Sequence, residues 1–311
     1  MDKNLGLTKR QKFEIFMLSH ILNPLWHSRL KRRQIRNGVY YKYVRKYLEK
    51  YIDFIKELPI EEVPVKKDGE PQGKIFSIWL QGEENAPKLV KRCFESFRKR
   101  YGDRFIVLDE KTLPNWIALP DYIEKKKAEG KIGAAHYSDI CRVELLYQHG
   151  GYWFDATDYL TDDIPQWIED SDFFLYREGE KITPTTFIQN CFMHARKGHP
   201  LFGAWRTLLH NYWKNEDKAV DYFFGHYLFR LLIENNADAN KLFFAMPQIN
   251  QDPTHVLWFK NRDKTYSEEL YKESTKDAFF QKLCYKKKQA VNPRPGSVAD
   301  YVVNGRIEIE P

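Results

Sequence analysis

Two carboxylates follow a short apolar run near the middle of the chain. In the stretch GGYWFDATDYL, from Gly150 to Leu160, Asp155 comes directly after YWF and Asp158 stands three residues later. An unpaired buried carboxylate is costly, so acids at the end of a strand either pair within the protein or lie at the rim of a sheet. At the rim they can bind a cation, and such oxygen ligands suit Mg²⁺ or Mn²⁺. An internal pair, a metal site and a plain surface loop all fit this stretch.

An acid and a base precede these carboxylates in a segment that predicts a helix over residues 136–148. Asp139 and Arg142 are three residues apart, which places them on one face of that helix. The rest of the segment is apolar, so we expect the pair to be buried. It is either a structural ion pair or a functional pair, in which Asp139 holds a sugar hydroxyl and Arg142 holds a phosphate or sugar oxygen.

Short apolar runs alternate with helical patterns around these residues. We expect strands over residues 74–80, 104–109, 152–155, 172–177 and 187–195, and helices over residues 87–100, 136–148, 201–215 and 219–235. This order predicts an α/β fold with a mostly parallel sheet. Ligands bind such sheets outside the carboxyl ends of the strands, which is where Asp109 and Asp155 fall.

The first 72 residues differ in character from the rest. Residues 8–58 predict helices, and residues 57–74 have the proline, glycine and charge of a linker. Apolar side chains precede a basic segment over residues 27–36, which is either a solvated helical cap or a surface that docks on anionic lipid. No stretch is long enough to span a bilayer and no signal peptide is evident. We therefore expect a cytoplasmic protein, soluble or peripheral on the inner face of the plasma membrane.

The composition allows one sizeable core and narrows the chemistry. The chain has 311 residues and a net charge of +7, which indicates an anionic partner. The sequence contains no glycine-rich phosphate loop and no GxSxG or HExxH motif. Four histidines lack the spacing of metal ligands and are expected in the core or on the surface: His194, His199, His210 and His226.

The central block SDICRVELLYQHGGYWFDATDYLTDDIP resembles the capsular polysaccharide synthesis glycosyltransferases. These are related to the DXD-sugar-binding transferases and, more distantly, to the large clostridial toxin glucosyltransferases. The stretches KIFSIWLQG, NCFMHARKGHPLF and DYFFGHYLFRLL fit the same pattern in the same order, and the resemblance covers residues 73–288. It implies a GT-A (Rossmann-like) fold, with a helical extension and linker over residues 1–72 and a catalytic domain over residues 73–311.

The resemblance also implies an activity. It implies a retaining glycosyltransferase that moves a hexose from a nucleotide-sugar donor, expected to be a UDP-sugar, with the help of Mn²⁺ or Mg²⁺. The implied acceptor is a saccharide, expected on a lipid diphosphate, in the synthesis of capsular or surface polysaccharide.

The resemblance assigns roles to individual residues. Asp139 and Arg142 match the donor-sugar pair, and Asp155 matches the first acid of the DXD motif. The third position of that motif is Thr157 in this chain. The metal shell is thus one carboxylate short, and Asp158, a water or an acid from the C-terminal part must complete it.

Further residues are implied to bind the donor. Trp79 and Gln81 match the strand end that frames the nucleotide. Gln189 and Asn190 match the segment that lines the sugar site, where Gln189 and Asp139 face the positive charge that develops on the sugar. The basic stretch KLCYKKKQ, which includes Lys286, is expected to close over the diphosphate or to form a solvated tail.

Two other functions fit parts of the sequence. Basic charge and many aromatic residues are typical of nucleic-acid-binding proteins, but the aromatics lie in apolar runs such as DYFFGHYLF, which predict core. A metal-dependent phosphohydrolase would use the acids around Asp155 and would leave the Asp139–Arg142 pair without a role. We therefore expect a transferase with no nucleic-acid partner.

Overall fold

The computed structural model describes residues 9–17, 38, 41–64, 73–179 and 187–308. Five strands form the central sheet, in the order β2 (Phe105–Leu108), β1 (Ile75–Ile78), β3 (Gly151–Phe154), β6 (Ile188–Ala195) and β5 (Phe173–Arg177). Each lies within a run predicted as a strand, apart from the first residue of β3, so the predicted α/β class is confirmed.

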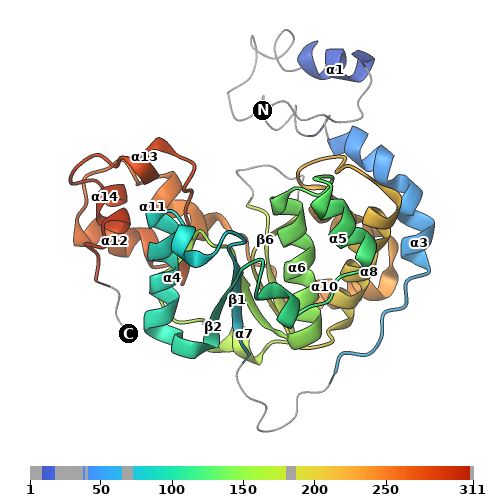
Figure 1. Ribbon diagram of the computed structural model, residues 1–311, viewed down its shortest axis with the longest axis horizontal. Helices are drawn as coiled ribbons and strands as arrows, with labels where there is room; N and C mark the ends of the chain where they lie inside the picture. The colour runs from blue at the N-terminus through green and yellow to red at the C-terminus, as the bar shows by residue number, and fades with distance from the viewer. Residues whose placement is uncertain (1–8, 18–37, 39–40, 65–72, 180–186, 309–311) are drawn as a thin grey trace.

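Helices lie on both sides of the sheet (Figure 1). One side carries α5 (Asp121–Ala128), α6 (Ala134–His149), α8 (Pro200–Asn215) and α10 (Ala237–Ala245). The other carries α4 (Lys88–Tyr101), α11 (Val256–Phe259), α12 (Glu268–Thr275), α13 (Lys288–Val291) and α14 (Val298–Val303). The remaining named α-helices are α1 (Lys9–Phe16), α3 (Ile52–Lys56), α7 (Gln166–Asp170) and α9 (Phe224–Asn235).

The sheet is mixed rather than mostly parallel. β1 runs parallel to β2 and β3, whereas β6 runs antiparallel to β3 and β5. Only residues 178–187 connect β5 to β6. A parallel pair needs a crossover of a dozen or more residues, so this short connection requires the antiparallel arrangement. The parallel half nevertheless brings the carboxyl ends of β1, β2 and β3 to one edge.

Two glycines allow β3 to begin beside β1. Gly150 ends α6 with a φ of 68°, and Gly151 begins β3 with a φ of 94°. A Cβ atom at Gly151 would lie 2.2 Å from the backbone oxygen of Lys74. Glycine is therefore required here both for the left-handed backbone and for the close approach of the two strands.

A second, two-stranded sheet was not predicted. β4 (Asp158–Leu160) pairs antiparallel with β7 (Phe280–Lys282), and this register places Lys282 opposite Asp158. The backbone N–H of Leu283 extends the pairing by donating to the carbonyl of Thr157 at 2.8 Å. This small sheet connects the loop after β3 to the C-terminal helices.

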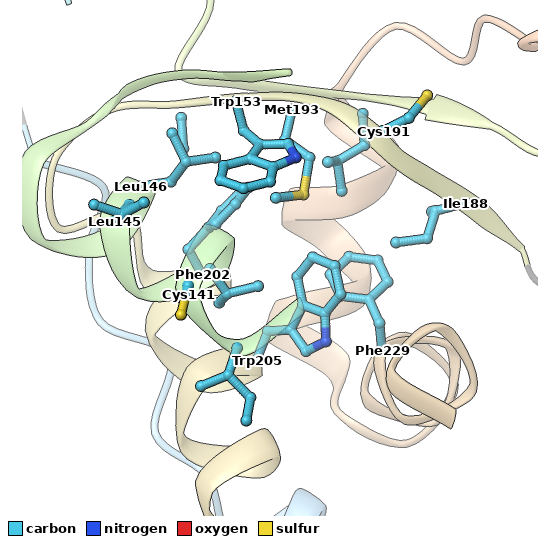
Figure 2. Close-up of a cluster of buried hydrophobic side chains, with 14 of the residues drawn as sticks. Cys141, Leu145, Leu146, Trp153, Ile188, Cys191, Met193, Phe202, Trp205 and Phe229 are labelled. Carbon is cyan, nitrogen blue, oxygen red and sulfur yellow. The ribbon is translucent and has the colours of Figure 1, made fainter. Parts of the chain in front are cut away.

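The aromatic residues form the core. The side chains of Trp153, Trp205, Trp213 and Trp258 are less than 2% exposed. Trp153 and Met193 lie side by side, and Trp205 packs against Phe229 with ring centroids 4.6 Å apart (Figure 2). Many of the aromatic residues are therefore core residues. They are not available on the surface to stack on nucleic-acid bases.

Part of the N-terminal segment joins this core. Val44, Leu48 and Ile55 are buried in the main hydrophobic cluster, and the side chain of Asn236, at the start of α10, donates to the carbonyls of Ile55 and Leu58. Residues 41–58 thus pack on the part of the chain that forms the main core. The division at residue 72 stays a prediction.

Only part of the predicted membrane-binding segment lies within the described residues. Phe13 and Phe16 of α1 are 62% and 50% exposed, whereas the basic segment over residues 27–36 lies outside the described residues. Among the described helices, none is long and apolar enough to cross a bilayer. Membrane docking therefore stays a prediction.

Buried His199 should make the protein sensitive to acid. The ring is fully buried against Phe173, with centroids 4.5 Å apart, and neither ring nitrogen has a hydrogen-bond partner among the described residues. Burial lowers the pKa of His199 to about 3, whereas the unfolded chain takes up this proton near pH 6.5. As the pH falls, the unfolded state therefore binds this proton before the folded state does. The free energy of unfolding consequently decreases as the pH drops from about 6.5 towards 3.

We expect His199→Phe to reduce this loss. Between pH 8 and pH 5 the parent should lose about 2 kcal/mol of unfolding free energy through His199, and the variant should lose that much less. Urea unfolding at the two pH values measures the difference. An equal loss in both proteins would show that His199 does not contribute to acid sensitivity.

Candidate active site

The two carboxylates after β3 meet through a tight turn. Asp155 directly follows β3, and the backbone N–H of Asp158 donates to the carbonyl of Asp155 at 2.9 Å. The carboxylate of Asp158 in turn accepts the backbone N–H of Asp155 at 3.0 Å. The chain thus turns at Ala156–Thr157, and the two acids lie together as the sequence suggested.

A lysine that we did not predict lies between these acids. The ammonium nitrogen of Lys282 is 2.6 Å from Oδ2 of Asp155 and 3.2 Å from Oδ1 of Asp158. The pairing of β7 with β4 sets this position. The basic stretch predicted to bind the diphosphate begins at Lys282, but the residue predicted to do so was Lys286. One sequence feature could have indicated this lysine. Lys282 directly follows the apolar and amide residues FFQ, and a lysine is unusual in a buried strand.

Arg142 links the helix pair to Asp155. Its guanidinium lies 3.3 Å from Asp139, 3.2 Å from Asp155 and 2.7 Å from the carbonyl of Asn190. It also lies within 3.3 Å of both oxygens of Ser138 and stacks over the ring of Trp153. With these oxygens around it, Arg142 acts as the residue that holds the two acids in place.

Asp139 receives a second partner from β6. The side-chain amide of Asn190 donates to Oδ1 of Asp139 at 2.9 Å. The structure thus brings together five of the residues singled out in the sequence and adds Lys282. We call this set the ionic cluster: Asp139, Arg142, Asp155, Asp158, Asn190 and Lys282.

Only part of the ionic cluster is open to a ligand. The side chain of Asp158 is fully buried and that of Arg142 is 7% exposed. Those of Asp139, Lys282 and Asp155 are 16%, 18% and 26% exposed. A ligand would therefore meet two carboxylates and one ammonium group.

Burial and neighbouring charges set the protonation of these groups. Burial raises the pKa of Asp158 to about 7 despite the nearby Lys282. Burial also acts on Asp155, but Lys282 and Arg142 outweigh it and hold the pKa of Asp155 below its usual value. Burial raises the pKa of Asp139 against the attraction of Arg142. Asp155 is therefore the acid most firmly ionised at neutral pH.

The ionic cluster does not fit a divalent metal in this arrangement. The ammonium group of Lys282 takes the position between the carboxylates of Asp155 and Asp158, where an ion shared by both would bind. Among the described residues, no three His, Cys, Asp or Glu side chains are arranged to hold a metal. Thr157, at the third position of the motif, offers its carbonyl to Leu283. The metal site at Asp155, Thr157 and Asp158 stays a prediction.

Trp79 and Lys286 both lie near Tyr285, a residue that we did not predict. The ring of Trp79, just after β1, packs edge-on against Tyr285 with centroids 5.5 Å apart, and the Lys286 ammonium lies 5.6 Å from the same ring. The indole N–H of Trp79 has no hydrogen-bond partner among the described residues. These three side chains form one surface at the carboxyl ends of the strands.

Three other predicted residues lie outside the ionic cluster. Asp109 follows β2, but its carboxylate accepts the backbone N–H groups of Lys111 and Thr112 and so holds a local turn. Gln81 is exposed. Gln189 is next to Asn190 in β6 and so points to the opposite face of the strand. Their roles in donor binding stay predictions.

An exposed aromatic residue also lies near the cluster. The side chain of Tyr222 is 50% exposed, and its ring centroid is 5.8 Å from that of His136, one helical turn before Asp139 in α6. No local pattern in the sequence distinguishes Tyr222 from the buried aromatics around it.

Comparison with known proteins identifies the family. The family described as "Capsular polysaccharide synthesis protein" matches residues 23–301. The chain belongs to this family. The predicted resemblance is therefore confirmed, and the family match includes the whole ionic cluster.

Curated relatives of this family member carry transferase names. The chain is 25% identical over 175 residues to "O-glycosyltransferase braB" of Annulohypoxylon truncatum, with 51% of the chain and 41% of that protein covered. It is 26% identical over 167 residues to "O-glycosyltransferase PaGT" of Phomopsis amygdali, with 46% of the chain and 40% of that protein covered. The chain thus spans about two fifths of the length of these relatives.

A solved structure named "PaToxG Glycosyltransferase" also matches the family member. The identity is 15% and the TM-score 0.39, with 68% of the chain and 84% of that structure covered.

Arg142→Lys should destabilise the protein although the charge is kept. An ammonium group offers three N–H donors from a single point and cannot reach the oxygens that the planar guanidinium contacts. We expect a loss of about 2 kcal/mol of unfolding free energy, because buried oxygens lose their partners. Urea unfolding measures this loss.

Arg98→Lys is the matched control. Arg98 pairs with Glu83 on the surface, where its side chain is 46% exposed, so this change should cost less than about 1 kcal/mol. If the Arg142 and Arg98 variants are equally stable, Arg142 does not hold the cluster together.

Proposed function

We propose that this chain is a retaining hexosyltransferase of capsular or surface polysaccharide synthesis. Its donor is a nucleotide-sugar, with UDP as the expected nucleotide, and its acceptor is a saccharide carried on a lipid diphosphate. Membership of the capsular polysaccharide synthesis family and the transferase names of the relatives support this proposal.

The ionic cluster carries the chemical argument. Departure of a nucleoside diphosphate develops negative charge on the leaving group and positive charge on the sugar, and fixed charges in a water-poor site stabilise both. In the partly buried ionic cluster, an ammonium group and carboxylate oxygens lie together at the carboxyl end of β3. Such an arrangement suits the separation of charge in glycosyl transfer.

Asp139 is suited to bind the donor sugar. Its Oδ1 atom is held by Asn190 and Arg142, whereas its Oδ2 atom has no hydrogen bond among the described residues. The fixed carboxylate can accept a sugar hydroxyl through Oδ2 and stabilise the positive charge on the ring. Arg142 then acts as a positioning residue for Asp139 and Asp155.

The surface around Tyr285 is suited to the nucleotide. A buried N–H without a protein partner, such as that of Trp79, is a donor that a ligand can satisfy. Its neighbour Tyr285 offers an aromatic ring and Lys286 a positive charge. The half-exposed ring of Tyr222 offers a face for the acceptor saccharide, because sugars pack on aromatic rings.

The bond changes balance without a further reactant. The bond between the anomeric carbon and the diphosphate oxygen breaks, and its electron pair stays on the leaving oxygen. The acceptor hydroxyl bonds to the anomeric carbon on the same face and gives its proton to the departing diphosphate. With water as acceptor, the same steps produce slow hydrolysis of the donor.

A panel of nucleotide-sugars tests the proposal. The parent should release free sugar and nucleoside diphosphate from one or a few donors, and the first-formed anomer should match that of the donor. p-Nitrophenyl phosphate should not be hydrolysed. Release of phosphate from that ester, with no turnover of any nucleotide-sugar, would establish the phosphohydrolase instead.

Asp155→Asn should lower donor turnover at least about 100-fold. The change removes the carboxylate that orients Lys282 and Arg142. Asp238→Asn is the matched control, because Asp238 is exposed in the first turn of α10 and should leave turnover unchanged. Circular dichroism and gel filtration should show that both variants fold. Turnover within twofold of the parent in Asp155→Asn would contradict the assigned site.

A further inference from the structure

We propose that the ammonium group of Lys282, in place of a divalent metal, is the cation that this site presents to the donor diphosphate. The inference rests on the nucleotide-sugar transfer proposed above. It names the group that stabilises the leaving diphosphate, a role that neither the family description nor the relatives assign to any residue.

Lys282 lies where a metal shared by the two acids would bind. Its nitrogen lies 2.6 Å from Asp155 and 3.2 Å from Asp158, between the two acids that follow β3. A metal bound by both carboxylates would have to displace this group or lie directly against a like charge. The ammonium therefore occupies the place and carries the sign of charge that the metal would supply.

The backbone around Lys282 is firmly held. The side chain of Gln281, next to it in β7, is fully buried, accepts the backbone N–H of Leu257 at 3.0 Å and donates to the carbonyl of Pro253 at 3.0 Å. Phe280 is buried in the main core and Leu283 in the core beneath the C-terminal helices. The backbone of Lys282 is thus held in place without a ligand, whereas a basic tail would have to fold over a ligand.

Lys282 also has a donor to spare. An ammonium group has three N–H donors. Asp155 accepts a hydrogen bond from Lys282, whereas Oδ1 of Asp158 pairs with the ammonium by charge at 3.2 Å without accepting a hydrogen bond. The guanidinium of Arg142, the other cation of the cluster, is 7% exposed and contacts the oxygens of Ser138, Asp139, Asp155 and Asn190. Lys282 is 18% exposed, so it is the cation of the cluster that can reach a phosphate oxygen.

The acids themselves fit a lysine better than a metal. The third position of the motif is Thr157, and the second acid comes instead from Asp158 in β4. One oxygen of Asp158 accepts the backbone N–H of Asp155, and its side chain is fully buried. A divalent ion usually keeps several waters, which a fully buried carboxylate cannot accommodate. A single ammonium needs no such shell.

In the reaction Lys282 donates a hydrogen bond and keeps its proton. The electron pair of the broken glycosidic bond stays on the diphosphate oxygen, and the acceptor proton goes to that oxygen. The N–H of Lys282 faces the negative charge as it develops.

Binding of pyrophosphate and of UDP in EDTA tests the inference without turnover. The parent should bind both ligands in isothermal titration calorimetry with excess EDTA. Lys282→Met should bind at least about 30-fold more weakly, and Lys282→Arg should bind within about tenfold of the parent. Lys276→Met is the matched control, because Lys276 is exposed and pairs with Glu273 on the surface. Equal binding by the parent and Lys282→Met would overturn the inference.

Donor turnover by the parent decides between lysine and metal even if a variant does not fold. After dialysis against EDTA the parent should keep its rate, and added Mn²⁺ or Mg²⁺ should change it less than about twofold. Loss of turnover in EDTA with full recovery in Mn²⁺ would overturn the inference and leave the proposed transferase intact. Failure to turn over or bind any nucleotide-sugar, with or without metal, would reject the proposed function itself.

Discussion

The ion pair between Asp155 and Lys282 is the contact on which the site depends. Charges alternate along the cluster, with Arg142 between Asp139 and Asp155, and Lys282 between Asp155 and Asp158. Each buried ion would cost several kcal/mol alone, and only the neighbouring opposite charge offsets this cost. Asp155 stands at the centre of the series because it contacts both cations.

This alternation explains why the elements around the site must be placed accurately. Asp139 and Arg142 come from α6, Asp155 follows β3, Asn190 comes from β6, and β4 and β7 bring Asp158 and Lys282. A shift of one residue in the β4–β7 register would turn Lys282 to the other face of its strand and leave Asp158 buried beside no cation. The fold thus fixes the charges before any ligand arrives, which is the condition for electrostatic catalysis.

The sequence predicted those parts of the molecule that depend on local pattern. Apolar runs located the five central strands, helical spacing paired Asp139 with Arg142, and the position after YWF placed Asp155 at a strand end. Asp109 shows the limit of this reasoning, because it also follows a strand, yet its carboxylate holds its own turn. Lys282 could not be predicted for a different reason. Its partner Asp155 is 127 residues away in sequence, and no spacing rule connects two strands as short as β4 and β7.

The long separation between Asp155 and Lys282 also determines when the site can exist during synthesis. A chain emerges from the ribosome at about 5–20 residues per second, so Asp155 is made roughly 10 s before Lys282. Pairings between distant segments form slowly, because a long loop must close first. During this interval Asp155 and Asp158 have no ammonium group between them. The nascent protein therefore folds most of its sheet before it has an assembled ionic cluster, and that cluster forms only when β7 joins β4.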